Sequence, residues 1–549
     1  MPAAAVIVAF VVLSVSFPDT AESLVDAAQR NVVSGFAWYY VLVVALFLAF
    51  VLWVGLSRYG DIRLGGDDDE PEFSTTAWFA MLFAAGMGIG LVFWGVYEPL
   101  SHFVDPKPGV SGSPSELAQV GLAQTYVHWG VHGWAVYGLL GLALGYAIHR
   151  RGRPVSIRWA VEPLLGGRVR GRVGDVIDIA AVVSGMFGVA TTLGFGALQM
   201  SGGFERVGIA DATTGLQVTL IVVLTAVATV SAVSGLAKGV KWVSKVNMGL
   251  AGLLLVFVLI AGPTLFLLRG FVQSIGNYFT GFLVLTFDVT AFEGAEGEAW
   301  QAQWTTFFWG AFLSWAPLVG VFIARISKGR TVREFVAGVL GVPTLISFLW
   351  FAIMGGSAIH RELFGAGGLV TGSTVDADVA FFDLLDVLPA GTATSVGALV
   401  LIALFFVTSS DSGSFVLSML SEGGHPNPPR WNRVFWSLAA AAVAIALLVT
   451  GGLVPLQTAL ILTALPFSIV MIGVCLATAR AFHAEHRAFV DAERQVLLQE
   501  ITERVTAHVT ERLDARSGDG LHTRRGRPAV GRVAELWEDE PLPPGRRAP

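Results

Sequence analysis

Apolar stretches of membrane-spanning length, separated by short polar segments, occupy most of the chain up to about residue 478. A helix needs about 20 mainly apolar residues to cross a bilayer. The first stretch is short, and because no basic segment precedes it we expect an uncleaved helix rather than a secretory signal. The pattern predicts twelve spans, at about 4–17, 36–57, 78–97, 117–148, 173–200, 216–233, 246–268, 304–326, 335–359, 394–420, 435–448 and 455–478.

Two further segments have helical periodicity without forming a span of their own. Residues 270–285 are amphipathic, and residues 482–513 carry many charges, as a cytoplasmic amphipathic helix would. The predicted division of the chain follows from these segments. It comprises 1–73 (two spans and a loop), 74–269, 270–303 (the amphipathic segment and a loop), 304–481, and 482–549 (a cytoplasmic helix and tail).

Composition supports a membrane protein with many spans. Only 14% of the 549 residues are charged and 54% are hydrophobic, whereas a soluble protein has about 25% charged residues. The single cysteine, Cys475, excludes an intramolecular disulfide. We find no nucleophile arrangement, metal cluster, cofactor motif or nucleic-acid signature, so the sequence predicts neither an enzyme nor a nucleic-acid-binding protein.

Basic residues orient the predicted bundle. With the N-terminus inside, 18 Lys and Arg residues fall in inner loops and 5 in outer loops. Basic residues are enriched on the cytoplasmic side of membrane proteins. We therefore expect both termini in the cytoplasm. The five outer residues are Arg30, Lys107, Arg206, Arg269 and Arg361.

Three alternating glycines, Gly86, Gly88 and Gly90, interrupt the apolar stretch at 78–97. Glycine costs about 1 kcal/mol relative to alanine inside a helix. Irregular backbone at membrane depth is tolerated only where protein buries it or where it lines a watery cavity. Broken helices of this kind form the binding sites of secondary transporters, although small residues also serve simply as a helix-packing face.

Aromatic residues and histidines share the predicted span at 117–148. Trp134 and Tyr137 lie on one face of a helix, and Trp129 lies about a turn and a half away. Rings that face a cavity attract quaternary ammonium groups, but tryptophans in membrane proteins also form interfacial belts. His128 and His132 are four residues apart, a spacing that permits metal binding, yet no third ligand is evident and a packed or hydrogen-bonded role is favoured.

The span at 304–326 contains a second candidate weak point. Pro317 removes one backbone hydrogen bond and leaves a carbonyl free. Two breakable helices in corresponding positions indicate two inverted repeats of five helices, with a binding site between them.

Thr408 and Ser409, in the span at 394–420, carry adjacent hydroxyl groups. They could bond to their own helix or coordinate a small hard cation, which prefers oxygen ligands.

Four segments can be compared with a known family: residues 86–90 (Gly-Met-Gly-Ile-Gly) with 98–101 (Glu-Pro-Leu-Ser), 128–130 (His-Trp-Gly) with Trp134 and Tyr137, 324–335 (Ala-Arg-Ile-Ser-Lys-Gly-Arg-Thr-Val-Arg-Glu-Phe), and 408–412 (Thr-Ser-Ser-Asp-Ser). Taken together, these segments resemble the betaine/carnitine/choline transporter family. The resemblance extends over about 350 residues with the spacing preserved.

The resemblance implies an all-α polytopic membrane protein of the cell membrane. Its twelve transmembrane helices would comprise two peripheral ones and a core of two inverted five-helix repeats, as in neurotransmitter–sodium symporters. It implies uptake of a small trimethylammonium compound by alternating access, with sodium as coupling ion and no other cofactor. The family's members are usually homotrimers, and the segment at 270–285 resembles the interfacial helix that holds the trimer together.

By this resemblance, an aromatic box would bind the substrate. Relatives that carry betaine usually have Trp where Phe312 stands, and relatives that carry choline tend to have Asp where Gly90 stands. Since Gly90 adds no charge, we expect a zwitterion such as glycine betaine, whose carboxylate meets the backbone of the glycine segment. The implied substrate-binding residues are Trp129, Trp134, Tyr137, Phe312, Trp315, Gly86, Gly88 and Gly90.

The resemblance also implies one sodium site. Sodium-independent exchangers of the family have Arg at the position of Asn247, so the uncharged side chain favours sodium coupling. The family's other sodium site looks absent, because its positions here are Gly185, Val189 and Leu318. The implied site uses the carbonyls of Ala84, Met87 and Phe405 and the side chains of Thr408 and Ser409.

Three alternatives remain open at this point. Within the family, the chain could be a sodium-independent exchanger or a proton-driven choline or carnitine carrier. Outside it, a channel would conduct without strict coupling, whereas a carrier saturates. A membrane enzyme is the third, and no motif supports it.

Overall fold

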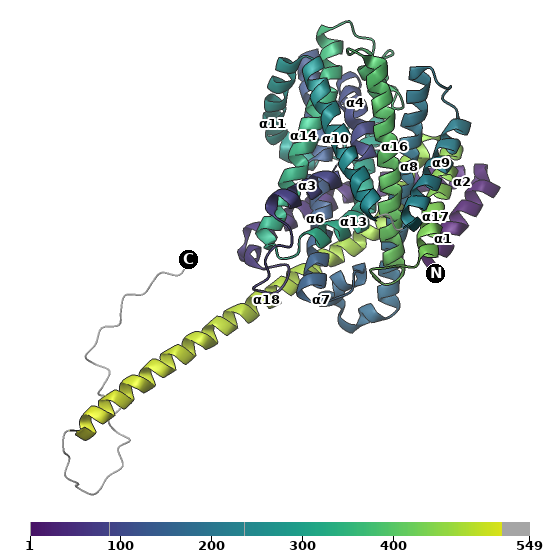
Figure 1. The fold of residues 1–549 in the computed structure, drawn as a ribbon. Helices are drawn as coiled ribbons and strands as arrows, with labels where there is room; N and C mark the ends of the chain where they lie inside the picture. Colours follow the sequence, from purple (N-terminus) through teal and green to yellow (C-terminus); the bar gives the residue numbers. More distant parts are fainter. Residues whose placement is uncertain (1, 87, 235–236, 519–549) are drawn as a thin grey trace. The chain divides into compact units, whose positions relative to one another are not determined.

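The structure is a computed structural model that describes residues 2–86, 88–234 and 237–518. The chain divides into two compact units, Met1–Ala484 and Glu485–Pro549. The helices, labelled in Figure 1, are α1 (Pro2–Ser16), α2 (Pro18–Leu56), α3 (Thr75–Gly86), α4 (Ile89–Val104), α5 (Pro114–Trp129), α6 (Val131–Gly145), α7 (Glu162–Leu165), α8 (Arg172–Val207), α9 (Thr214–Ser234), α10 (Ala237–Ala261), α11 (Thr264–Thr286), α12 (Gly294–Gln301), α13 (Phe307–Ile326), α14 (Val332–Phe364), α15 (Ala380–Asp386), α16 (Gly391–Ser421), α17 (Arg430–Gly451) and α18 (Leu453–Gly518).

The predicted class, an all-α protein with many membrane spans, is confirmed. Within the described ranges, ten helices are long and apolar enough to cross a membrane, and two bent pairs raise the number to twelve. One pair joins α1 to the first part of α2 at 117°, so the short first stretch does not form a complete span by itself. Pro18 begins the new helix, since proline fits the first turn of a helix but cannot continue the preceding one.

The third predicted span is broken where the glycines predict it. α3 ends at Gly86, α4 begins at Ile89, and the two helices meet at 65°. Gly88 lies between them with extended backbone, at φ −166° and ψ −176°. α4 is almost wholly buried from Ile89 to His102. The break therefore lies inside the protein, where irregular backbone is tolerated at membrane depth.

The span predicted at 117–148 is interrupted, which the sequence analysis did not anticipate. α5 ends at Trp129 and α6 begins at Val131, because Gly130 has a non-helical backbone with φ −89° and ψ −147°. A Cβ added at Gly130 would lie 2.4 Å from the Tyr126 carbonyl oxygen, so only glycine fits. Trp129 is thereby placed on a different helix from Trp134 and Tyr137.

The weak point expected at Pro317 does not break its helix. Pro317 lies inside α13, and helix runs without interruption from Gly294 to Ile326. The irregularity instead lies upstream, where residues Ala302–Thr306 form a wide π-helical turn. A proline removes one hydrogen bond from the ladder, and here the surrounding packing holds the helix together across that gap.

Seven helices pack around the centre of the first unit. α13 packs against both α6 and α8, α16 packs against α8, and α4 packs against α5 and α14. In Figure 1, α16 runs beside α8, and α14 runs beside α11. The side chains between these helices form one continuous buried cluster. The broken helix α3–α4 is thus held on several sides by neighbours.

The segment 324–335 ties the first half of the broken helix to the helices that follow. Backbone hydrogen bonds join Leu64 N to Arg330 O at 2.8 Å and Gly329 N to Leu64 O at 2.8 Å. The Trp78 indole on α3 donates to Ser327 Oγ at 3.1 Å, and the Arg330 guanidinium lies 4.6 Å from the centre of the Trp78 ring. These contacts anchor α3 to the loop between α13 and α14.

The twelfth span and the predicted cytoplasmic helix form one helix. α18 extends from Leu453 to Gly518 without a break, since no glycine or proline separates the two predicted segments. Both predicted segments, 455–478 and 482–513, are helical, and they are continuous with each other. In the second unit the apolar and polar side chains of α18 are exposed alike. The predicted tail beyond residue 518 lies outside the described residues.

Asp378, in the segment between α14 and α15, gives the protein a pH-dependent stability. Burial and, to a smaller extent, the nearby Asp376 carboxylate raise the pKa of Asp378 to about 6. Because the pKa is higher in the folded state, the stabilising proton is bound fully below about pH 4 and is lost as the pH rises through 6. We expect Asp378→Asn to raise the melting temperature of the detergent-solubilised protein at pH 7.5 and to leave it unchanged at pH 4.

The exposed neighbour Asp376 provides the matched control for this prediction. Asp376→Asn removes a charge from the same segment and relieves Asp378 only of the smaller of the two effects that raise its pKa. It should raise the melting temperature at pH 7.5 by much less. An Asp378→Asn protein that melts at the wild-type temperature at pH 7.5 would contradict the prediction.

Candidate functional site

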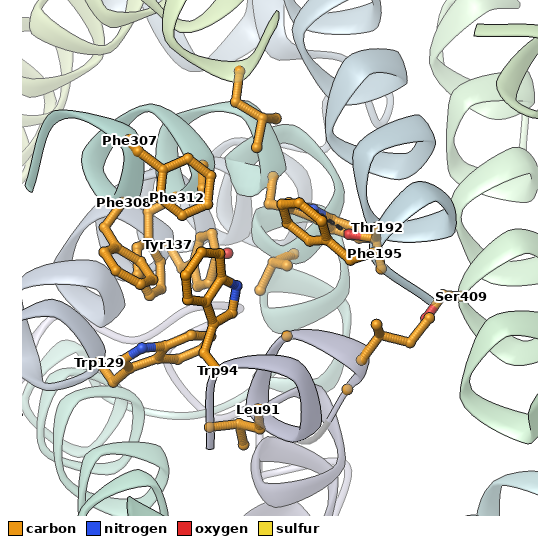
Figure 2. A pocket seen from close by; sticks show the side chains of 17 residues that line it. Leu91, Trp94, Trp129, Tyr137, Thr192, Phe195, Phe307, Phe308, Phe312 and Ser409 are labelled. Atoms are coloured by element: carbon orange, nitrogen blue, oxygen red, sulfur yellow. Dashed lines mark hydrogen bonds between the residues drawn. The ribbon is translucent and has the colours of Figure 1, made fainter. Parts of the chain in front are cut away.

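A cavity of about 190 Å³, here called the aromatic cavity, lies beside the break between α3 and α4. Figure 2 shows the side chains that line it, and these come from seven helices and the break. Its lining residues are Gly88, Ile89, Gly90, Leu91, Trp94, Trp129, Tyr137, Thr192, Phe195, Phe307, Phe308, Ala311, Phe312, Trp315, Val319, Ser409 and Leu460.

Rings from α5, α6 and α13 form one wall of the aromatic cavity. The Phe312 ring lies 5.1 Å from the Tyr137 ring and 6.0 Å from the Trp129 ring, measured between ring centres. Trp129 also meets Phe308 edge to face at 5.5 Å. This arrangement depends on the interruption at Gly130, because α5, which carries Trp129, and α6, which carries Tyr137, can then run in different directions. A wall of ring faces can attract a cation without a formal charge.

Trp134 does not line the cavity, although the sequence placed it in the aromatic box. Its side chain is buried, with 4% of its surface exposed. Its ring packs edge to face against the Tyr137 ring at 5.4 Å. Trp134 therefore supports the wall from behind. On a helix, positions three apart share a face, but the side that the neighbouring helices leave open is decided by tertiary packing.

Four large aromatic residues at the cavity were missed: Trp94, Phe195, Phe307 and Phe308. The Trp94 ring packs on the Phe307 ring at 5.2 Å and on the Phe308 ring at 5.3 Å. Figure 2 shows them with Trp129 and Tyr137 around the same space. Only the density of aromatic residues at 304–315 hinted at Phe307 and Phe308, and Trp94 had no sequence signal beyond its apolar span.

The N-terminus of α4 forms the other side of the aromatic cavity. Gly88, Ile89, Gly90 and Leu91 line it, and these are the cap and first residues of α4. The first amides of a helix lack partners within it and carry a partial positive charge. Gly86 ends α3, and its surroundings lie outside the described part of the structure. The described lining residues carry no ionisable acid or base apart from the Tyr137 phenol.

A second cavity of about 280 Å³, here called the α16 cavity, adjoins the first. Both are lined by Trp315, Val319 and Ser409. Four of the five positions expected to hold sodium line the α16 cavity: Ala84, Phe405, Thr408 and Ser409. The fifth, Met87, lies outside the described residues.

Oxygen atoms are available at the α16 cavity. Thr408 Oγ1 donates to the carbonyls of Leu404 at 2.9 Å and Phe405 at 3.1 Å, and its lone pairs remain able to bind a cation. Asn247 also lines the cavity. Its side chain is only 2% exposed, and its Oδ1 has no hydrogen-bond partner within the described part of the chain.

The histidines of the aromatic motif do not pair with each other. His132 Nε2 is hydrogen-bonded to Thr286 Oγ1 at 2.8 Å. His128 instead comes together with Glu98 and His102, with one nitrogen or oxygen of each within 4.8 Å of the others. Both nitrogens of His128 already have hydrogen-bond partners. A metal ion would have to displace these bonds, so we assign no metal to the trio.

Comparison with known proteins identifies the family. A model of the betaine/carnitine/choline family of transporters matches residues 1–487. The chain belongs to this family. It is accordingly a multi-span transporter of the plasma membrane, not an enzyme, and the compounds in the family's name are all small quaternary ammonium compounds.

Individual relatives are similar to this chain over most of their length. An uncharacterized transporter of Mycobacterium tuberculosis (strain H37Rv) is 48% identical over 489 residues, which are 88% of this chain and 82% of the relative. The glycine betaine transporter OpuD of Bacillus subtilis is 42% identical over 491 residues, 89% of this chain and 95% of the relative. A glycine betaine transporter of Acinetobacter baylyi is 38% identical over 498 residues, 90% and 74% of the two chains.

Proposed function

We propose that this chain imports a zwitterionic quaternary ammonium compound, most simply glycine betaine, together with sodium. The observation that carries the proposal is the aromatic cavity, which combines a wall of rings with the N-terminus of α4. A trimethylammonium group fits against rings such as Trp129 and Tyr137. A carboxylate fits the free amides of a helix N-terminus. Relatives named glycine betaine transporters, at 38–42% identity, support this choice of substrate.

The absence of an acid among the described lining residues favours a zwitterion over a free cation. A cationic substrate such as choline would bring a net positive charge into a site without a counter-charge, which is costly away from water. A zwitterion brings its own carboxylate. Glycine at position 90 also leaves room, since a Cβ there would lie 3.1 Å from the Trp129 ring.

Sodium coupling is proposed from the α16 cavity. Backbone and hydroxyl oxygens from α3 and α16 line it together with Asn247, and hard cations prefer such ligands. Because Trp315 and Ser409 line both cavities, each ligand can stabilise the arrangement that binds the other. Coupling of this kind is reciprocal: sodium raises the affinity for substrate as much as substrate raises that for sodium.

Alternating access between two inverted repeats, 74–269 and 304–481, is proposed as the mechanism. In this mechanism one site opens to each side of the membrane in turn. Cytoplasmic termini, and a homotrimer held by the interfacial segment at 270–303, complete the proposal. α11, which occupies much of that segment, exposes large apolar side chains such as Val272, Phe279 and Val284, which suits contact with lipid or with another subunit.

Uptake of labelled glycine betaine into proteoliposomes tests the proposal. We expect saturable uptake with an inward sodium gradient and little with potassium in its place. Equal uptake in both salts would instead indicate exchange or proton coupling, and a pH gradient would separate these two. If glycine betaine is not transported, the substrate assignment is wrong, and ectoine, proline, carnitine and choline would be tested next.

Gly133→Ala should disrupt the cavity wall. A Cβ at Gly133 would lie 2.3 Å from two carbons of the Phe312 ring, so the ring must move. Overpacking of this kind costs about 1–3 kcal/mol, and we expect the KM for glycine betaine to rise about tenfold. The matched control is Gly138→Ala on the same helix, whose Cβ would lie 3.4 Å from Val339. A wild-type KM in the Gly133→Ala protein would show that Phe312 does not shape the site.

A further inference from the structure

A third cavity, of about 280 Å³ and here called the arginine cavity, lies where two spans end. The end of α6 and the segment after it form one wall and supply Arg151 and Arg153. The part of α18 that belongs to the first unit forms the other wall and supplies Arg480. Arg151 follows the span predicted at 117–148, and Arg480 follows the span predicted at 455–478. We therefore place this cavity at the boundary between membrane and water.

Packing and backbone hydrogen bonds fix the two walls of the arginine cavity. The Tyr146 ring, at the end of α6, meets the Phe482 ring of α18 at 5.1 Å between ring centres. Arg151 N donates to the Tyr146 carbonyl at 3.1 Å, and Arg153 N donates to the Ala147 carbonyl at 2.9 Å. These contacts hold the chain that follows α6 against α18, so that arginines from both walls border one space.

One of the three arginines is already neutralised. Arg153 donates from Nε and Nη2 to the two carboxylate oxygens of Glu162, both at 2.6 Å. Its guanidinium also lies 5.2 Å from the centre of the Trp159 ring, which borders the same cavity. A pair of parallel hydrogen bonds is the geometry that arginine prefers with a carboxylate. Arg153 is thus held in the wall by Glu162 and Trp159.

The other two arginines have no such partner. Within the described part of the chain, the side chains of Arg151 and Arg480 form no ion pair and no hydrogen bond. Three arginines against one glutamate give the lining a formal charge of +2. Like charges that share a cavity repel one another. An anion bound beside Arg151 and Arg480 would relieve that repulsion.

Thr478 adds a hydroxyl group to the lining. Its side chain is buried, and its Oγ1 has no hydrogen-bond partner within the described chain. A rotation of this side chain can therefore present a donor to a ligand without breaking an existing hydrogen bond. Much of the remaining lining is apolar, with five alanines and Trp159. The cavity thus offers donors for an anionic group and apolar surface for whatever the group is attached to.

We propose that the arginine cavity binds a phosphate group, with Arg151 and Arg480 as its principal ligands. A phosphate presents oxygens in several directions, so guanidinium groups from two different walls can bind it together. A carboxylate has two oxygens in one plane and is satisfied by a single arginine, as Glu162 is by Arg153. The phosphate group can belong to an acidic phospholipid, which the position at the membrane boundary suits, or to free phosphate. The site does not depend on the substrate proposed above.

Thermal unfolding of the purified, detergent-solubilised full chain tests the site. A ligand that binds only the folded protein raises the melting temperature as it saturates the site. Two probes are used, inorganic phosphate at constant ionic strength and dihexanoylphosphatidylglycerol, with potassium chloride and zwitterionic dihexanoylphosphatidylcholine as their respective references. A saturable rise with phosphate over chloride identifies free phosphate as the ligand. A rise only with the acidic lipid identifies a phospholipid headgroup. No rise with either probe would overturn the proposal.

Replacing both unpaired arginines removes the principal ligands. Both side chains are exposed, so Arg151→Gln with Arg480→Gln should melt at the wild-type temperature when no probe is present. We expect the apparent affinity for the active probe to fall at least tenfold. Wild-type affinity in this double variant would place the bound phosphate elsewhere and overturn the proposal.

Arg168→Gln with Arg172→Gln is the matched control. These two arginines are also exposed, and they lie outside the arginine cavity. Their replacement removes the same amount of charge and should leave the affinity for the probe unchanged. If the control loses as much affinity as the first double variant, the probe responds only to the overall charge of the protein, and the assigned site is wrong.

Glu162→Gln provides a variant with the opposite expected effect. It removes the charge that neutralises Arg153, so a third arginine becomes available to the ligand. We expect the affinity for the active probe to rise about tenfold. An unchanged or weaker affinity would show that these residues only hold the wall together, and it would overturn the proposal even if the arginine variants fail to fold.

Discussion

Replacing Thr408 and Ser409 together by alanine should abolish sodium-driven uptake of glycine betaine. Both residues line the α16 cavity beside Ala84 and Phe405. An ion that loses two oxygen ligands loses about 1.5–3 kcal/mol for each, which corresponds to a decrease in sodium affinity of about a hundredfold or more. Uptake into proteoliposomes would be measured over a range of sodium concentrations.

Thr394→Ala is the control for this double replacement. Like Thr408, Thr394 bonds back to its own helix α16, with Oγ1 2.8 Å from the Ala390 carbonyl, but it lies near the exposed start of the helix. Its replacement should leave uptake unchanged. Wild-type uptake at low sodium in the double variant would remove the ion site from the α16 cavity.

Replacing Trp315 by leucine should weaken the binding of both the substrate and sodium. Trp315 lines both cavities, and its indole donates to Thr192 Oγ1 at 3.2 Å. Removing the ring deletes part of the aromatic wall and opens the partition between the cavities. We expect the KM for glycine betaine and the sodium concentration for half-maximal uptake each to rise about tenfold or more.

Thr192→Val separates the hydrogen bond of Trp315 from its ring. This variant removes the acceptor and leaves the indole in the wall, so its effects should be smaller than those of Trp315→Leu. If Trp315→Leu raises the KM but leaves the sodium dependence unchanged, Trp315 contributes to the substrate site only. The reciprocal coupling proposed for the two cavities would then need another route.

The sequence predicted the interruption of α3–α4 but not that of α5–α6. Three glycines within five residues lower the local helix propensity enough to be recognised without a structure. Gly130 is a single glycine, and single glycines are tolerated inside helices. It interrupts the span because its backbone lies so close to the Tyr126 carbonyl that a side chain has no room. The Tyr126 carbonyl is only four residues earlier, but the Phe348 ring of α14, which lies 3.0 Å from the same Cβ position, is brought there by tertiary packing and leaves no local pattern.

Pro317 is the opposite case, in which the sequence predicted a weak point and the structure has an unbroken helix. Proline is a strong local signal against helix, yet α13 continues through it. α13 packs against both α6 and α8, and packing of this extent outweighs the loss of one hydrogen bond. A local preference worth a few kcal/mol predicts structure only where the tertiary contacts do not oppose it.

The sequence by itself determined the membrane class, the positions of most spans, the family and the break at the glycines, because these depend on the composition and order of neighbouring residues. Only the tertiary structure decided which side chains face the cavity. It placed Trp134 behind Tyr137 and brought Trp94 to the lining. It also set Glu98 against Trp129, 31 residues further along the chain. Helical periodicity specifies a face of a helix, whereas the space that a face borders depends on how distant helices pack against one another.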